Sequence, residues 1–233
     1  MRSCRHGARL IRERSADKDT TREDELTVKS SRIGTCVHEA GHAIISYLLG
    51  VRFLHMEVLD EARGEVVPES TSCSTCIEYY ERSDPTTDDH SRAIQDDLRR
   101  QAAVATAGEI AENELGPGTV VDESELAQDR ALARCRASFI HLWADGRCRR
   151  DGSWESNTTC SLCDAFLSSL RSVVKAQLLK PTVSAQVVRL AESLEVRGRL
   201  HWDEVVDFLK EHLDYGSIHI DALPGAPPGQ AKN

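Results

Sequence analysis

Apolar positions near the start of the chain follow the helical period. Ile33, Val37, Ile44 and Leu48 recur at intervals of four and seven between residues 31 and 50, and a glycine closes the segment. This spacing places apolar side chains on one face of a helix, and glycine commonly ends a helix. We therefore predict a helix over residues 31–50.

The next pattern has a period of two. In residues 51–59, VRFLHMEVL, the apolar residues Leu54, Met56 and Val58 stand at alternate positions, which predicts a strand. Residues 64–89, which follow, are polar and contain a proline and a C-x-x-C pair. We expect loop with little regular structure there.

Helical patterns return in the rest of the chain. We predict helices over residues 88–115 and 124–144, and two or three amphipathic helices between residues 165 and 213. Small residues in the first of these helices favour close approach to a neighbour: Ala102, Ala103, Ala105, Ala107 and Gly108.

The two ends of the chain differ from its middle. Residues 1–30 are charged and carry few large apolar side chains, so burial offers little to offset the entropy of ordering, and we expect a flexible arm. Residues 214–233 are expected to form a flexible tail containing proline and glycine. Between them, residues 31–213 are expected to form one mainly α (α+β) domain with a small β-sheet or edge strand.

Composition and charge narrow the range of partners. The 233 residues have a formal net charge of -9, which argues against binding to nucleic acid or to an anionic membrane surface. The longest apolar run, residues 43–51, is far shorter than the roughly 20 residues of a membrane span. No apolar stretch follows the basic first residues, so we expect no secretory signal and a cytoplasmic location.

The sequence HEAGH, residues 38–42, lies inside the first predicted helix. On a helix, His38 and His42 project from one face, one turn apart, where two imidazoles can bind one zinc ion. Glu39 can take a proton from a zinc-activated water and pass it to a leaving amine. This H-E-x-x-H pattern predicts a catalytic zinc with Glu39 as general base. The alternative is a half-buried helix that carries two structural histidines.

A catalytic zinc needs a third protein ligand. The extended pattern with a third histidine is absent, because Leu48 stands at that position. Glu109 and Glu112 in AGEIAENEL, and Asp129 in AQDRALARC, are the candidates. Gly41 lies inside the predicted helix at a cost of about 1 kcal/mol relative to alanine, so we expect a neighbouring segment to approach closely there.

Several segments together resemble a known family. HEAGHA, AGEIAENELG, and an aspartate followed by alanines four and eight residues later (Asp129, Ala133, Ala137) resemble the peptidase domain of FtsH-type zinc metalloproteases. VVRLAESLEVRGRLHWDEVVDFL resembles the closing helices of that domain. The resemblance covers roughly residues 32 to 212 and is most specific at HEAGHA.

The resemblance carries expectations about fold and site. It implies a helical zinc-peptidase domain with Asp129 as the third zinc ligand and Glu39 as the base. Glu109 and Glu112 would then lie outside the ligand set, as partners of the ligands or as packing residues.

The chain departs from that family in two respects: it lacks a phosphate loop, and it carries two C-x-x-C pairs in polar inserts. It contains no G-x-x-x-x-G-K-[ST] phosphate loop, so we expect neither the ATPase module of the family nor its membrane anchor. Accordingly, the protein is expected to cut accessible or unfolded segments, to cut a specific partner, or to work with a separate ATPase. Assembly into a homo-oligomer is a further expectation from the family.

The cysteines offer a second candidate site. Cys73 and Cys76 (CSTC) and Cys160 and Cys163 (CSLC) form two C-x-x-C pairs, which together predict a structural zinc. Surface thiols or a redox pair are the alternatives. The remaining cysteines considered are interpreted as packing thiols: Cys36, Cys135 and Cys148. Four histidines stand singly and are interpreted as structural residues: His55, His90, His141 and His201.

The sequence leaves three hypotheses about function. The leading hypothesis is a zinc metalloendopeptidase whose polypeptide substrate lies along the edge of the predicted strand, residues 51–59. The second is a catalytically quiet, zinc-containing module that binds a peptide or a partner, and intact Glu39 speaks against it. The third is a zinc hydrolase that acts on a non-peptide substrate, for which the sequence gives no positive sign.

Overall fold

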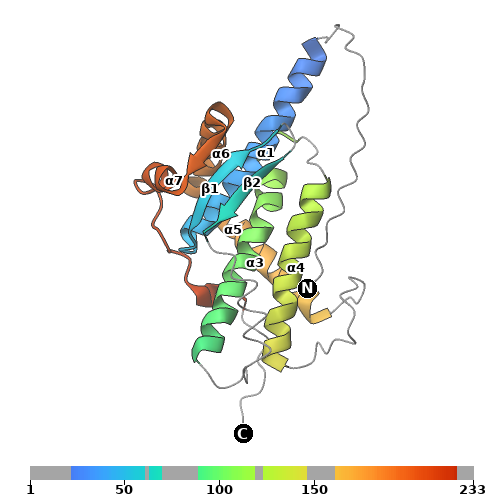
Figure 1. The fold of residues 1–233 in the computed structure, drawn as a ribbon, viewed down its shortest axis with the longest axis vertical. Helices are drawn as coiled ribbons and strands as arrows, with labels where there is room; N and C mark the ends of the chain where they lie inside the picture. The colour runs from blue at the N-terminus through green and yellow to red at the C-terminus, as the bar shows by residue number, and fades with distance from the viewer. Residues whose placement is uncertain (1–21, 61–62, 70–88, 119–122, 146–160, 225–233) are drawn as a thin grey trace, which may run out of the picture.

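The computed structural model describes residues 22–60, 63–69, 89–118, 123–145 and 161–224. Within these ranges the chain is mainly helical, with one small three-stranded antiparallel sheet (Figure 1). This agrees with the predicted mainly α (α+β) class. None of the described helices combines the length and the apolar character that crossing a membrane requires.

The first helix, α1, spans Arg22–Leu48. It begins well before the predicted start near Ser31, so the arm predicted over residues 1–30 is helical from Arg22 onward. No proline or glycine stands between residues 22 and 30, so nothing in the local sequence ends the helix there. The C-terminal half of α1 is buried from Gly34 to Leu48 and forms the centre of the core.

α1 packs most extensively against α3, which spans Asp89–Leu115 and confirms the helix predicted over residues 88–115. The two backbones approach closely at Gly41. A Cβ atom at this glycine would lie 2.5 Å from Cβ of Ala111 and 2.8 Å from the carbonyl oxygen of Ala107. The expected close approach at Gly41 is therefore confirmed, and small residues on both helices make it possible.

The sheet has the order β2-β1-β3, with both pairs antiparallel. β1 (Phe53–Val58) is the predicted strand, whereas β2 (Gly64–Pro68) lies in the segment predicted as loop. β3 (Arg199–His201) is a three-residue strand that sequence periodicity cannot reveal. β1 pairs with a strand on both sides, so the prediction that a peptide binds along its edge is wrong. β2 is an edge strand instead.

The two faces of the sheet differ in chemistry. Met56 of β1 and Leu200 of β3 are fully buried and face the helical core. His55 and Glu57 occupy the alternate positions of β1, on the outer face.

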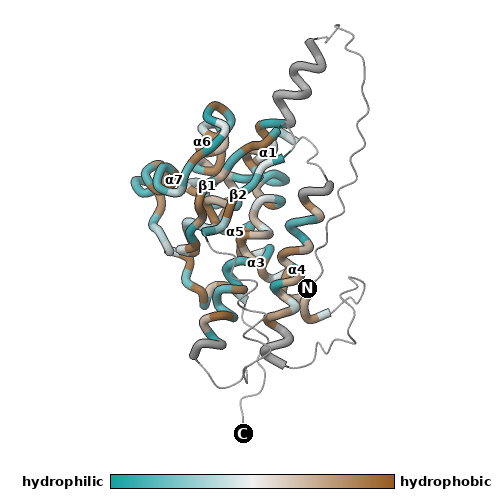
Figure 2. Tube along the Cα trace, in the orientation of Figure 1, coloured by the Kyte–Doolittle hydropathy of each residue, from teal (hydrophilic) through white to brown (hydrophobic). Residues whose placement is uncertain are grey.

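Four more α-helices lie in the described ranges. The structure confirms the helix predicted over residues 124–144 and contains three helices in the last third of the chain. They are α4 (Glu123–Asp145), α5 (Ser161–Leu178), α6 (Pro181–Arg197) and α7 (Trp202–Leu209). α3 packs against α1, α4 and α5, while α6 packs against the other side of α1. Hydrophobic and hydrophilic positions alternate along these helices, as amphipathic packing requires (Figure 2).

The chain continues to pack after α7. The backbone N–H groups of Gly216 and Ile218 donate to the carbonyl oxygens of Tyr47 and Leu48 at the end of α1. Arg99 of α3 donates to three carbonyl oxygens in residues 220–224, around the short helix η1 (Ile220–Ala222).

Leu223 is 3 % exposed and belongs to the core. The boundary predicted at residue 213 therefore lies too early, and residues 225–233 fall outside the described ranges.

Candidate metal centre

HEAGH lies in the buried half of α1, and its two histidines meet an aspartate from α4. Nε2 of His38 and Nε2 of His42 are 3.0 Å apart, and each lies 2.9 Å from Oδ2 of Asp129. Both histidines are buried, while the Asp129 side chain is 17 % exposed. The structure thus brings together the three predicted ligands, which are distant in sequence.

The spacing of these three atoms suits a small divalent cation. In a tetrahedral zinc site with bonds of about 2.0–2.1 Å, ligand atoms lie roughly 3.3 Å apart. Each pair here would need to separate by only about 0.4 Å. The donor set of two imidazoles and one carboxylate also suits zinc, with a fourth position left for a substrate or water.

The outer nitrogens of both imidazoles have protein partners. Nδ1 of His38 lies 3.2 Å from Oε2 of Glu112, and Nδ1 of His42 lies 2.7 Å from the carbonyl oxygen of Val104. When each Nδ1–H donates in this way, each Nε2 keeps its lone pair for a metal. Glu112 is thus a partner of a candidate ligand, as expected from the resemblance.

Glu109 has a different role. Its two carboxylate oxygens accept hydrogen bonds from Arg130 of α4 at 2.9 Å and Arg171 of α5 at 2.6 Å. Burial raises the pKa of Glu109, but the hydrogen bonds from Arg171 and Arg130 outweigh it and lower the pKa to about 2. Glu109 therefore ties three helices together and does not meet the imidazoles.

α3 covers the imidazoles from the side opposite α1. A Cβ atom at Gly108 would lie 2.4 Å from Nε2 of both His38 and His42. The absence of a side chain at Gly108 thus leaves the space in which an ion would sit. The run of small residues in α3 predicted close approach, but it could not show that Gly108 faces the imidazoles.

The electrostatics of the site favour added positive charge. Burial lowers the pKa of His38, but hydrogen bonds to Asp129 and Glu112 raise it overall to about 10. The pKa of Asp129 is held well below its usual range, because the two imidazoles outweigh the effect of burial. Without an ion, protons on the histidines must balance the surrounding carboxylates, and a divalent cation would replace them.

Glu39 lies beside this cluster in a confined position. It is 3 % exposed, and its Oε2 atom has no hydrogen-bond partner among the described residues. A Cβ atom at Gly64, the first residue of β2, would lie 2.6 Å from Cγ of Glu39. Burial raises the pKa of Glu39, which makes its carboxylate a stronger base. No sequence signal marked Gly64, because this contact depends on how the hairpin lies over α1.

The cluster opens into a cleft of about 760 Å³ between α1, β2, α3 and α4. This volume lies within the usual range for ligand sites. β2 lines the cleft along its whole length, from Gly64 beside Glu39 to Pro68. The cleft is therefore bordered by an edge strand and has the candidate base and the three candidate ligands in its wall.

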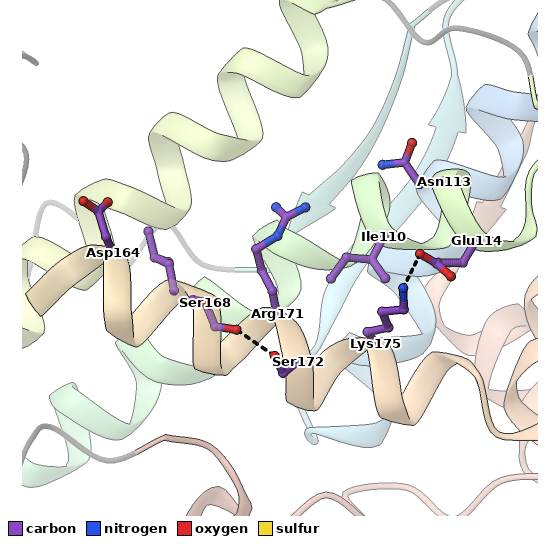
Figure 3. A pocket seen from close by; sticks show the side chains of 9 residues that line it. Ile110, Asn113, Glu114, Asp164, Ser168, Arg171, Ser172 and Lys175 are labelled. Carbon is purple, nitrogen blue, oxygen red and sulfur yellow. Dashed lines mark hydrogen bonds and ion pairs between the residues drawn. The ribbon is translucent and has the colours of Figure 1, made fainter. Parts of the chain in front are cut away.

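A second cavity of about 470 Å³ lies between α3 and α5 (Figure 3). Its two cationic side chains are already paired: Lys175 with Glu114 at 2.5 Å, and Arg171 with Glu109. It shares no lining residue with the cleft, so the three candidate ligands and Glu39 lie outside it.

The predicted cysteine site stays a prediction. Cys73, Cys76 and Cys160 lie outside the described residues. Cys163 is 1 % exposed near the start of α5, with its Sγ atom 3.8 Å from Oγ of Ser138. Cys36 is fully buried in α1, in agreement with its interpretation as a packing thiol.

Comparisons with known proteins add no assignment. No family model matches this chain, and no curated protein matches it either. Function must therefore be inferred from the geometry of the cleft and from the sequence pattern.

Proposed function

We propose that this protein is a zinc metalloendopeptidase with a peptidase domain of the FtsH type. The observation that carries the proposal is the convergence of His38, His42 and Asp129 beside the buried, unpartnered carboxylate oxygen of Glu39. When bound at these ligands, zinc would polarise a peptide carbonyl and acidify a water molecule. A cytoplasmic location, a separate ATPase partner and homo-oligomers belong to the same proposal.

The residues around the ligands would have distinct tasks. Glu39 would accept the proton of the attacking water and deliver it to the leaving amine. Gly64 lets the hairpin press on Glu39, so the carboxylate is held in one position. Glu112 and the carbonyl of Val104 would hold the imidazoles with Nε2 turned toward the ion.

An extended polypeptide would bind along β2. An edge strand offers unpaired backbone N–H and C=O groups, which can add a substrate segment by main-chain hydrogen bonds. Because β2 runs along the cleft that contains Glu39, this mode brings a peptide bond past the candidate ligands. Such binding requires an accessible or unfolded segment.

A binding module that keeps zinc but does not cut is the second candidate. The placement of Glu39 argues against it. Among the described residues Oε2 of Glu39 has no partner beside the candidate ligands, so this carboxylate is available to a water molecule, as a general base requires.

The test is cleavage of casein by wild-type protein and by Glu39→Gln, with zinc content measured on both. We expect one zinc at this site in each protein and cleavage by the wild type only. Glu192→Gln, which changes an exposed carboxylate on α6, is the matched control and should cut normally. If both wild type and Glu39→Gln bind zinc and neither cuts, the binding module is the better account.

A further inference from the structure

The outer face of the sheet carries a second group of metal-ligating side chains. His55 and Glu57 are alternate residues of β1, and Glu65 of β2 stands directly opposite Glu57 in the strand register. One ligand atom from each residue lies within 4.8 Å of the other two. None of its three members is a candidate ligand of the first centre, but Glu65 also lines the cleft and so lies near the proposed site.

Two members of the cluster are mostly shielded from solvent. The side chain of His55 is 19 % exposed and that of Glu57 is 13 % exposed, with Nε2 of His55 3.5 Å from Oε1 of Glu57. Glu65 is exposed, so the group is open to solvent at this residue.

Arg199 of β3 leaves one oxygen of Glu57 available. Both Nε and Nη2 of Arg199 donate to the same atom, Oε2 of Glu57, with the Nε contact at 2.6 Å. Oε1 therefore stays turned toward His55. A guanidinium on the far oxygen holds a carboxylate in place, as outer partners of metal ligands commonly do.

His201 of β3 lies opposite His55 in the strand register but is not a member of the cluster. Its backbone N–H donates to Oε2 of Glu204 at 2.8 Å, at the start of α7. With Arg199 counted, the two carboxylates still leave the cluster one negative charge when His55 is neutral, which attracts a cation.

We propose that His55, Glu57 and Glu65 form a second site for a divalent transition-metal ion such as Zn²⁺. One imidazole and two carboxylates are ligands that zinc, cobalt and manganese share. An ion at this site would link β2 to β1, because it would be coordinated by side chains of both strands. Since β2 contributes Gly64 above Glu39 and lines the cleft, the ion would stiffen the rim of the cleft. The interpretation of His55 as a purely structural residue is replaced by this proposal.

The test is a titration of the metal-free protein with Co²⁺. Calorimetry and visible absorption measure how many equivalents bind. We expect wild-type protein to bind one equivalent more than Glu65→Gln or His55→Ala. Glu69→Gln, a carboxylate change just beyond the other end of β2, should bind as the wild type does. Any ion at the cysteines is recognised separately by thiolate-to-cobalt absorption, which the proposed site cannot produce.

Thermal unfolding gives an independent readout. The melting temperature of wild-type protein should rise further at high Co²⁺ than that of Glu65→Gln, because binding to the folded state stabilises it. Equal stoichiometry in wild type, Glu65→Gln and His55→Ala would overturn the proposal. Neither measurement depends on peptidase activity. The proposed second metal site can therefore fail while the proposed function holds, and the reverse.

Discussion

The contact between Gly108 and the two imidazoles supports a sharp prediction. In Gly108→Ala the new methyl group would lie 2.4 Å from Nε2 of His38 and of His42, about 1 Å closer than the 3.4 Å at which ordinary contact begins. The backbone of α3 is held by its packing on α1, so the imidazoles must turn away. Metal sites tolerate shifts of only about 0.2 Å in bond length, so both bonds to zinc would be lost or strained.

The expected effect is large for metal binding and small for folding. Altering only an outer partner of a metal ligand weakens binding about 10- to 100-fold, so displacing two ligands should weaken it at least 100-fold, or about 2.7 kcal/mol. Alanine favours a helix over glycine by about 1 kcal/mol, which offsets part of the steric cost of about 1–3 kcal/mol. Gly108→Ala should therefore remain folded.

Zinc affinity measured against a chromogenic chelator, with circular dichroism to check folding, tests this prediction. Gly64→Ala is the matched control, because its methyl group would press on Cγ of Glu39 and not on the imidazoles. It should keep zinc but lose most casein cleavage. Folded Gly108→Ala that binds zinc with wild-type affinity would refute the location of the site.

Three other predictions follow from single contacts. Asp129→Asn should lose zinc, whereas Glu112→Gln should keep it with an affinity about 10- to 100-fold weaker; equal affinities in a chelator competition would reject this assignment. The pKa of Glu109 is lowered to about 2, so its ion pairs stabilise the fold above its ordinary pKa and this stability is lost as the pH falls toward about 2. Between about pH 5 and pH 2, the free energy of unfolding in urea should fall by up to about 3 kcal/mol more in the wild type than in Glu109→Gln, a difference that screening reduces. Burial raises the pKa of Cys36 to about 12, so iodoacetamide should label it only after denaturation, and rapid labelling of the native protein would contradict its placement.

The sequence revealed those parts of the site that depend on spacing within one helix. His38 and His42 are four residues apart, so a helix alone puts them on one face. Gly41 was informative for a similar reason, since glycine inside a helix indicates a close neighbour. The third candidate ligand required the resemblance, because helical periodicity cannot show which of three acidic residues approaches from another element.

Contacts between distant elements escaped prediction. β2 is a five-residue strand that depends more on pairing with β1 than on its own composition. The expectation that a polar, proline-containing stretch forms a loop was therefore wrong for these residues. The same pairing brings Glu65 opposite Glu57, so a cluster invisible in the linear sequence arises from strand register. The helix from Arg22 extended further than expected, because a charged composition does not itself prevent helix formation.

The segment after α7 has a practical consequence for shorter versions of this protein. It supplies the N–H groups that satisfy the terminal carbonyls of the HEAGH helix, and its own carbonyls accept from Arg99. An expression fragment cut after α7 would expose those groups together with the apolar surface beneath Leu223. Fragments intended for crystallisation or biophysics should therefore extend at least through Pro224.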